Sequence, residues 1–503
     1  MSEFSLALKK VIRNQNTTIL TLSKNSGVDR TSLQHMLTGK YLPASIEVVE
    51  NILNAMILTP VQQKELIRLY YIARIGEDAY DRNLLVKDIF ESVDTLTYPR
   101  LTIPGMNYQH DFKIFAQTSS FSSSHEVKLI IKAVLEDESS KDSGYVKLML
   151  QPDFEFVMEL MLILTNSCPQ LEAEHIFCMY QDVHKAANHQ NLHSFKAILP
   201  LLIHGASYQP YIFYGNSAGC VSNTSLFPFL IITSDKILSI SYDLNQAILH
   251  QDKDIHAIYL NQFSRIKAIS KPLIDKIRSP MDMYHRYSIL DIGINSEKTQ
   301  AAFTYTLFSQ PCLLFFVGKE HLSKYMYDNS EKENLIQMIL HRNSSYLSRF
   351  TNGYHFTTYF TEEGLDDFWN TGRIREIPNY FYAPVDPEDR LQIIRNFIDM
   401  TLDTACHPIL INTGKFKLSR HMVVSAVDET SVILIYNHPR SGMMHFIFHE
   451  YMIASSFFRF IQNLSNSVLV YSEEESRKML KQKLLQYEEE LQNSRNRTQY
   501  FIT

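Results

Sequence analysis

Two glycines near the start of the chain constrain its fold more tightly than any other feature. Gly27 and Gly39 each follow a short run with apolar residues at helical spacing, and glycine can take the left-handed conformation that ends a helix at no steric cost. Asp29 can cap the second run, and Pro43 prevents that helix from resuming. Residues 17–56 therefore predict three short helices joined by tight turns.

The apolar residues of these helices fall on one side of each. The first helix, capped by Thr17 or Thr18, has Ile19 and Leu22 inward. The second turns Leu33, Met36 and Leu37 inward, and a third helix from Ser45 to about Ala55 has four apolar residues on one face. The outward positions of the second helix are polar: Arg30, Thr31, Gln34 and His35.

The turn Leu22-Ser23-Lys24-Asn25-Ser26-Gly27-Val28 and the link Gly39-Lys40-Tyr41-Leu42-Pro43-Ala44-Ser45 resemble the Cro/phage-repressor (XRE) class of helix-turn-helix domains. The resemblance covers roughly residues 4–75. Two positions depart from the family pattern, because Ile19 replaces a common Gln and Leu37 replaces a frequent Glu. Ile19 removes one of the family's usual contacts to DNA.

This resemblance implies that the second helix enters the major groove of double-stranded DNA. Matched by position, Arg30, Thr31, Gln34 and His35 would face base edges, since Arg suits guanine and Gln suits adenine. The phosphate-contacting candidates would be Thr18, Ser32, Lys40 and Tyr41. The alternative is a small helical bundle used only for protein contacts.

The charge distribution favours the DNA interpretation. Residues 1–75, here called the head, contain nine Lys or Arg and five Asp or Glu, a balance of +4. Because the whole chain is −6, the remainder carries −10. A basic head on an acidic remainder would orient itself on a polyanion.

Composition limits the rest of the chain. With 503 residues we expect two or three domains, and 45% hydrophobic and 20% charged residues are values of globular proteins. The five cysteines are scattered, which is typical of reduced thiols. The N-terminus does not resemble a signal peptide, and no apolar stretch is long enough for a bilayer. We expect a soluble cytoplasmic protein without membrane contact.

The predicted fold class is multidomain: an all-α N-terminal helix-turn-helix domain followed by a large α+β body with antiparallel hairpins. Residues 76–100 would form a helical linker or dimerisation arm, or simply cap the head. Hairpins are predicted within 229–241 and 421–436, each followed by a helix, which suggests two related α+β halves, 101–295 and 296–503. The final helix, from Glu473 to about Arg497, has an apolar stripe suited to a helix–helix seam or to a solvated terminal helix: Leu480, Leu484, Tyr487 and Leu491.

Catalytic patterns are sparse. There is no phosphate-binding loop, no His-Glu-x-x-His and no dinucleotide fingerprint, so we expect no cofactor and no metal. Residues 215–219 match the Gly-x-Ser-x-Gly of a hydrolase, with Ser217 as nucleophile, but the following residues are a poor helix start, and a turn between strands is the favoured interpretation. His184, His189 and His193 are better explained by a polar helix than by a metal site.

Residues 359–378 combine the only tryptophan with arginines, glycines and carboxylates. Residues of these types form ligand sites on loops, and they are equally common in ordinary packing between domains. If the body senses an anionic effector, Trp369, Arg373 and Arg375 are the first candidates, because guanidinium groups bind carboxylates and phosphates through two parallel bonds.

Together these features predict a sequence-specific DNA-binding transcriptional regulator. It would bind a DNA operator as a homodimer, since one recognition helix reads few base pairs, and its body would sense a small-molecule or peptide effector. Two alternatives remain open: a protein-interaction component of antitoxin or phage-defence type, and a DNA-tethered hydrolase.

Overall fold

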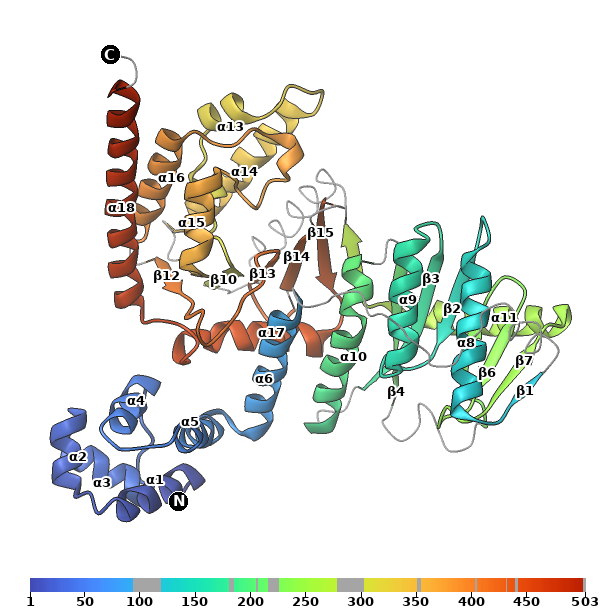
Figure 1. Ribbon diagram of the computed structural model, residues 1–503, viewed down its shortest axis with the longest axis horizontal. Coiled ribbons are helices and arrows are strands. Elements are labelled where there is room, and N and C mark those ends of the chain that lie inside the picture. Colours follow the sequence, from blue (N-terminus) through green and yellow to red (C-terminus); the bar gives the residue numbers. More distant parts are fainter. Residues whose placement is uncertain are drawn as a thin grey trace.

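The computed structural model describes residues 1–93, 119–180, 185–204, 207–215, 226–277, 303–350, 354–402, 405–430, 432–438 and 442–500 (Figure 1). The protein is multidomain-like, with many helices and two mixed β-sheets. Within these ranges no helix is long and apolar enough to cross a membrane.

The head folds into helices around a core of its own. Its elements are α1 (Glu3–Asn14), α2 (Ile19–Ser26), α3 (Arg30–Thr38), α4 (Ile46–Asn54) and α5 (Pro60–Ile75). Thr59 and Gln62 form a capping box at the start of α5, and Pro60 occupies its first turn. From the rest of the chain, the partly buried Val468 packs against this core.

Helix α6 (Glu77–Ser92) follows the head and packs into the body. Its residues Val86, Ile89 and Phe90 are fully buried. The expectation of a helix after residue 76 is therefore confirmed, and residues 94–100 of the expected arm lie outside the described residues. Because the apolar face of α6 is buried in the body, this helix is a structural part of the body.

The first sheet has the strand order β1-β7-β6-β5-β2-β3-β4-β8. Its strands are β1 (Ser120–Phe121), β2 (Tyr145–Met149), β3 (Glu172–Tyr180), β4 (Tyr208–Gly215), β5 (Phe229–Ile232), β6 (Ile237–Ile240), β7 (Ala247–His250) and β8 (Lys271–Pro272). Strands β2, β3 and β4 run parallel, and β5, β6 and β7 continue the sheet as an antiparallel meander.

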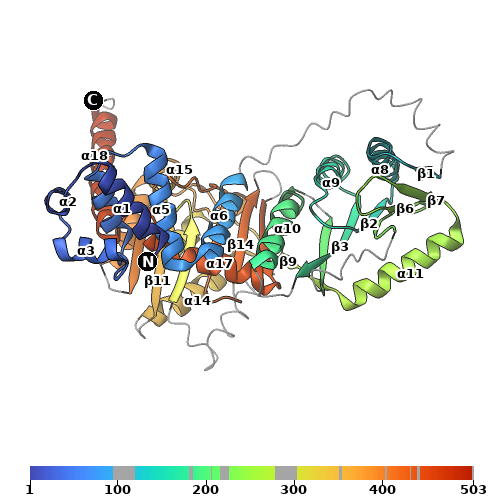
Figure 2. The same cartoon turned by 90° about the horizontal axis from the view of Figure 1, so that it is seen from below.

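Helices cover both faces of this sheet (Figure 2). One face packs against α8 (Ser124–Ser139), α9 (Glu155–Ser167) and α10 (Lys185–His204), while the other packs against α11 (Lys253–Ile269). Alternate strand residues explain the division, because Ile231 points into the first core and its neighbours Leu230 and Ile232 point towards α11.

The second sheet has the order β12-β11-β10-β13-β14-β15-β9. Its strands are β9 (Ile274–Ile277), β10 (Phe303–Phe308), β11 (His355–Phe360), β12 (Cys406–Leu410), β13 (Met422–Ala426), β14 (Val432–His438) and β15 (Gly442–Phe448). The associated helices are η2 (Leu314–Phe316), α13 (Lys319–Tyr325), α14 (Lys332–Phe350), α15 (Glu362–Thr371), η3 (Asn379–Phe381), α16 (Pro387–Met400), α17 (Tyr451–Asn463), η4 (Leu464–Asn466) and α18 (Glu473–Tyr500).

The two sheets repeat one topology. In each, three parallel strands adjoin a three-stranded antiparallel meander, a helix follows the meander (α11 or α17), and an earlier strand (β1 or β9) pairs antiparallel with the last meander strand. Strand β9 lies before residue 295 yet belongs to the second sheet, and the expected boundary at 295–296 lies outside the described residues.

The predicted hairpins are confirmed as β5–β6 and β13–β14. The parallel pairing within β2–β4 and within β10–β12 was not predicted. Each predicted hairpin encloses a short polar turn that the sequence shows, whereas parallel neighbours are joined by long connections and no local turn marks their pairing.

Aromatic packing joins the two halves of the body. The Phe90 ring of α6 lies 5.5 Å from the Phe457 ring and 5.8 Å from the Phe460 ring, both of α17. From α10, Phe195 lies 5.9 Å from Phe457. Helices α6, α10 and α17 therefore share one core that extends into both sheets.

Candidate nucleic-acid interface

Three local devices shape the turn between α2 and α3. The Thr18 hydroxyl accepts a hydrogen bond from the Thr21 amide and caps α2. Gly27 ends α2 with φ +71°, in the left-handed region. Asp29 caps α3 by accepting from the amides of Thr31 at 2.8 Å and Ser32 at 3.0 Å. The sequence predicted each of these three roles.

The Asp29 carboxylate is held in its ionised form. Hydrogen bonds from the Ser32 hydroxyl and amide, with a further contribution from the Thr31 amide, lower the pKa of Asp29 below its usual value. The charge sits at the positive end of the α3 dipole, where it favours helix formation. The cap therefore keeps α3 in place at neutral pH.

Buried side chains fix how α2 and α3 sit in the head. Leu22 and Leu33 are fully buried, and Met36 is 1% exposed. Val49 and Ile52 of α4 close the same core from the other side. Because the apolar side of α3 faces this core, its polar side faces outward.

The outer face of α3 is open. Arg30, Thr31, Gln34 and His35 are all exposed. Arg30 and Gln34 are one turn apart, as are Thr31 and His35, so the four side chains form one patch. Among the hydrogen bonds and ion pairs of the described residues, none uses the side chain of Arg30, Gln34 or His35.

The phosphate-contacting candidates differ in availability. Thr18, Lys40 and Tyr41 are exposed, and Tyr41 retains 42% of its surface. Ser32 is half-buried, and its hydroxyl bonds to Asp29. A hydroxyl already engaged by a carboxylate is a weaker donor to a phosphate.

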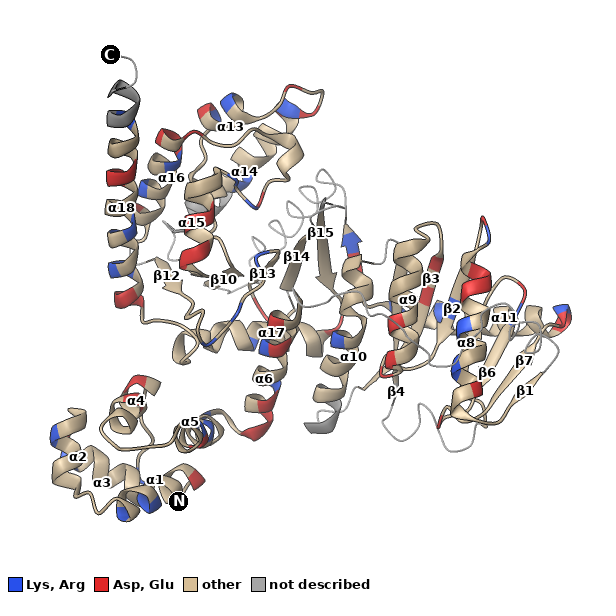
Figure 3. Ribbon diagram, in the orientation of Figure 1, with Lys and Arg blue, Asp and Glu red and all other residues tan. Residues whose placement is uncertain are grey.

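Helix α1 adds basic residues that the motif comparison did not include. Lys10 and Arg13 are exposed and Lys9 is half-buried, and α1 packs against α3. Figure 3 shows basic residues over α1 and α2, and acidic residues on α4. The signal in the sequence was the local charge, because the first 41 residues contain six Lys or Arg and only two carboxylates, Glu3 and Asp29.

The head contacts the body through the side opposite α2 and α3 (Figure 1). Lys415 of the body pairs with Glu50 of α4 at 3.0 Å. The Val468 amide donates to the Tyr71 hydroxyl of α5 at 2.9 Å. Attachment through α4 and α5 leaves the outer face of α3 uncovered by the body.

The three candidate effector residues all make internal contacts. The Trp369 indole N–H donates to Glu490 at 2.6 Å, and its ring stacks on Tyr487 at 4.7 Å. Arg373 donates to the Tyr382 carbonyl at 2.7 Å, and Arg375 pairs with Asp367 at 2.8 Å. These contacts give each side chain a packing role, and effector binding there stays a prediction.

Among the described residues, the remaining sequence candidates form no further site. Ser217 and His184 lie outside the described residues. His189 faces the Asp78 carboxylate at 3.6 Å, and burial lowers the pKa of His193. In the described ranges, no three His, Cys, Asp or Glu residues come together in a way that could hold a metal ion.

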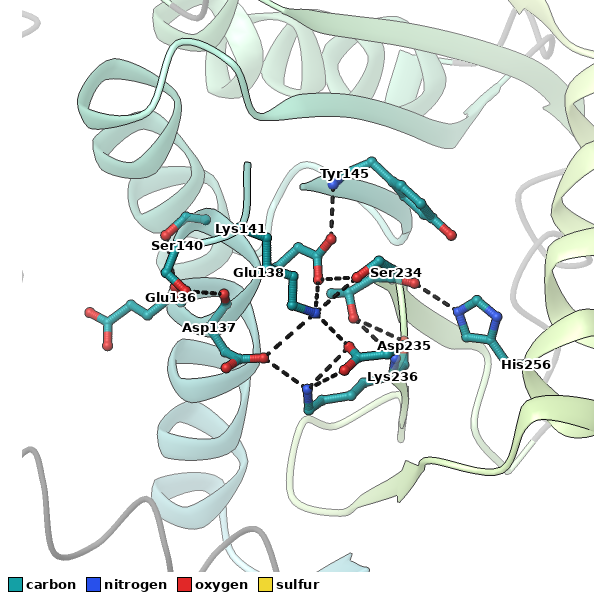
Figure 4. Close-up of polar contacts among 12 residues, drawn as sticks. Glu136, Asp137, Glu138, Ser140, Lys141, Tyr145, Ser234, Asp235, Lys236 and His256 are labelled. Carbon is teal, nitrogen blue, oxygen red and sulfur yellow. Dashed lines mark hydrogen bonds and ion pairs between the residues drawn. The ribbon is translucent and has the colours of Figure 1, made fainter. Parts of the chain in front are cut away.

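A charged cluster in the body ties the end of α8 to the β5–β6 turn (Figure 4). Buried Glu138 accepts from Lys141 at 2.7 Å, from the Ser234 hydroxyl at 2.8 Å and from the Tyr145 amide at 2.9 Å. Lys141 also pairs with Asp235 at 2.8 Å. Because these groups satisfy one another, the cluster is a structural clasp.

Comparison with known proteins shows no family. No family model and no curated protein matches the chain. A phosphatidylserine synthase of Haemophilus influenzae is 9% identical with a TM-score of 0.24, over 76% of this chain and 98% of that chain. A polyphosphate kinase of Porphyromonas gingivalis is 9% identical with a TM-score of 0.23, over 86% of this chain and 65% of that one. Similarities this weak indicate neither a shared fold nor a shared function.

Proposed function

We propose that this protein is a cytoplasmic, sequence-specific DNA-binding transcriptional regulator with a helix-turn-helix head. The observation that carries the proposal is the open face of α3, where Arg30, Thr31, Gln34 and His35 project without competing side-chain partners. An α-helix fits the major groove, and these side chains match the hydrogen-bonding groups of base edges.

Charge and attachment support the same proposal. Lys40 and the basic residues of α1 lie on a head of balance +4, and the acidic residues of α4 lie towards the body. Such a polarity would turn α3 towards a polyanion. Symmetric half-sites would then hold two heads, because a single helix reads few base pairs.

The body is proposed to provide dimerisation and effector sensing. Cytoplasmic location is supported by the cysteines of the described residues, Cys168, Cys178, Cys312 and Cys406, which are not joined in disulfides. The alternatives are a protein-interaction component of antitoxin or phage-defence type and a DNA-tethered hydrolase, whose candidate nucleophile Ser217 lies outside the described residues.

Fluorescence anisotropy on the protein's own upstream DNA, with random DNA as competitor across a salt series, tests the proposal. Arg30→Ala or Gln34→Ala should reduce discrimination by about 1–3 kcal/mol, since each removes a two-point base contact. Lys40→Ala should weaken binding to all sequences and flatten its salt dependence. Lys478→Ala, on the exposed side of α18, is the matched control and should bind like the wild type. If the three head variants all bind like the wild type, α3 does not read DNA.

A further inference from the structure

A groove lies between α9 and α10 beside the first sheet (Figure 1). Each helix connects two neighbouring parallel strands, α9 from β2 to β3 and α10 from β3 to β4, so the two helices run in the same direction. The groove has a volume of about 510 Å³. Small-molecule sites in proteins have volumes in this range.

The groove is acidic at one end and apolar at the other. Carboxylates line it where the two helices begin: Asp153, Glu155 and Glu159. Apolar side chains line it towards the ends of the helices: Leu162, Ala197 and Pro200. A ligand that fits both ends therefore has a polar head and an apolar tail.

The carboxylates of the acidic end have no partner in the described chain. Among the hydrogen bonds and ion pairs of the described residues, none uses the side chain of Asp153, Glu155 or Glu159. Partial burial raises the pKa of Asp153. The dipole of α9 offsets the charges of Asp153 and Glu155 at its start, whereas Glu159 lies a full turn inside the helix. Lys196 also lines the groove, but it is paired with Asp88 of α6.

Helix α10 supplies a backbone acceptor nearer the apolar end. Pro200 lies inside α10 and has no N–H group, so the Lys196 carbonyl lacks the helical donor that another residue would provide. Both residues line the groove, which places this carbonyl at its wall. The carbonyl and the carboxylates are all acceptors, so they favour a ligand with N–H donors.

We propose that this groove binds a small aliphatic amine as the effector of the protein. The ammonium group lies among the carboxylates and donates charge-assisted hydrogen bonds to them. The hydrocarbon chain lies against Met158, Leu162 and Ala197, where it leaves water. The same carboxylates repel an anionic ligand, which separates this groove from the anion site expected at Arg373 and Arg375.

The regulatory consequence rests on the proposed function. Helix α10 contacts α6 through the pair of Lys196 with Asp88 and through His189, whose Nε2 lies 3.6 Å from an Asp78 carboxylate oxygen. Helix α6 follows the head directly, through Gly76. An ammonium group in the groove changes the electrostatic surroundings of Lys196, and its pair with Asp88 transmits that change to the helix that carries the head.

Isothermal titration calorimetry of the full chain without DNA tests the groove, with hexylamine as the probe. Two controls separate its parts, since 1-hexanol has the chain without the charge and ammonium chloride has the charge without the chain. Hexylamine should bind once per chain and about tenfold or more tightly than either control. Equal binding of hexylamine and 1-hexanol, or of hexylamine and ammonium chloride, overturns the proposal.

Variants locate the binding in the groove. Glu159→Gln should raise the dissociation constant of hexylamine about threefold to fivefold, because it removes one partly exposed charge and keeps the shape. Glu172→Gln is the matched control, since Glu172 is an exposed carboxylate at the start of β3, and it should bind like the wild type. Ala197→Phe fills the apolar end and should abolish binding. Circular dichroism checks that the variants fold, and a Glu159→Gln variant that binds like the wild type overturns the proposal.

Hydrogen exchange measures the step from the groove to α6. Saturating hexylamine should raise the protection of the α6 amides in the wild type and leave it unchanged in Ala197→Phe. Unchanged protection in the wild type overturns the regulatory consequence. None of these measurements uses DNA, so failure of the groove and failure of the head to read DNA are distinguishable.

Discussion

Single residues in this chain act through backbone conformation and through burial, and the two can be separated. Gly27 has φ +71°, yet a Cβ built on it would meet nothing within 4 Å. Its requirement is therefore conformational. His175 is the opposite case, because it lies in ordinary β-strand and its surroundings are what constrain it.

Gly27→Ala should destabilise the head by about 1 kcal/mol, because an L side chain pays that much in the left-handed region. Gly27→Asn should cost less, since Asn tolerates this conformation. Hydrogen exchange of the α2 and α3 amides is the suitable measurement, as the only tryptophan lies in the body. Gly318→Ala is the control, because Gly318 has an ordinary φ of −79°. Equal protection in Gly27→Ala and wild type would contradict the prediction.

His175 should make the body less stable in acid. It is fully buried, and its Nε2 donates to the Leu150 carbonyl at 2.9 Å while Nδ1 accepts from the Tyr208 hydroxyl at 2.7 Å. Burial lowers the pKa of His175 from 6.5 to about 4, so the unfolded chain takes up a proton more readily than the folded one between those values.

The stabilising contribution of neutral His175 is complete above pH 6.5 and is lost as the pH falls towards 4. From pH 7 to pH 5 the loss should be about 2 kcal/mol. Urea unfolding followed by circular dichroism at several pH values measures it. His175→Phe should be less stable at pH 7 and should show a smaller change with pH. An unchanged pH slope in that variant would rule out His175 as the cause.

At the scale of elements, contacts between side chains far apart in the sequence determine which helices pack together. The apolar stripe of α18 packs within the chain, with Leu480 and Tyr487 at 1% exposure in the core shared with α15 and α16. The predicted seam is therefore confirmed as intramolecular. The same scale explains the clasp of α8, where Glu138 binds a turn 96 residues later in the sequence.

Tyr487→Ala should destabilise the second half of the body by about 3–5 kcal/mol, because it removes a buried ring. It also uncovers Trp369, which stacks on that ring, so the tryptophan emission of the folded variant should move to longer wavelength. Leu485→Ala, on the exposed side of the same helix, should change neither quantity. An unshifted emission spectrum would contradict the stacking.

Glu138→Ala should cost about 2–3 kcal/mol, because it leaves the Tyr145 amide and part of the Lys141 charge without their buried partner. Asp142→Ala is the matched control, since Asp142 is an exposed carboxylate in the turn that follows α8. Thermal unfolding of both variants measures the difference. If the two lose equal stability, the clasp contributes no more than a surface ion pair.

At the scale of the whole molecule, the two halves of the body share a core while the head keeps its own. Phe90→Ala should remove about 3–5 kcal/mol from the body, because Phe90 lies where α6 meets α17. Amide protection in α2 and α3 should not change, since Phe90 has no place in the head core. Leu84→Ala, at a residue 47% exposed on α6, is the control. A parallel loss of protection in the head would show one cooperative unit.

Local chemistry is readable from the chain alone, and it accounts for the head and the hairpins. Caps such as Asp29, turns such as Gly27 and the 3.6-residue period of α3 depend on neighbours a few positions away. The balance of +4 over residues 1–75 is also readable from the chain, and it supports the proposal that the head binds a polyanion. The outward side chains of α3 follow from the same period.

Long-range pairing was decided only in the tertiary structure. Strands β2–β4 and β10–β12 pair in parallel across long connections, so their order depends on contacts between segments that are distant in the sequence. Likewise, Trp369 stacks on Tyr487 and Arg375 pairs with Asp367, and the residue types alone do not indicate these partners. The type of a residue determines which groups its side chain can bind. Which partner it contacts depends on how distant parts of the chain pack together.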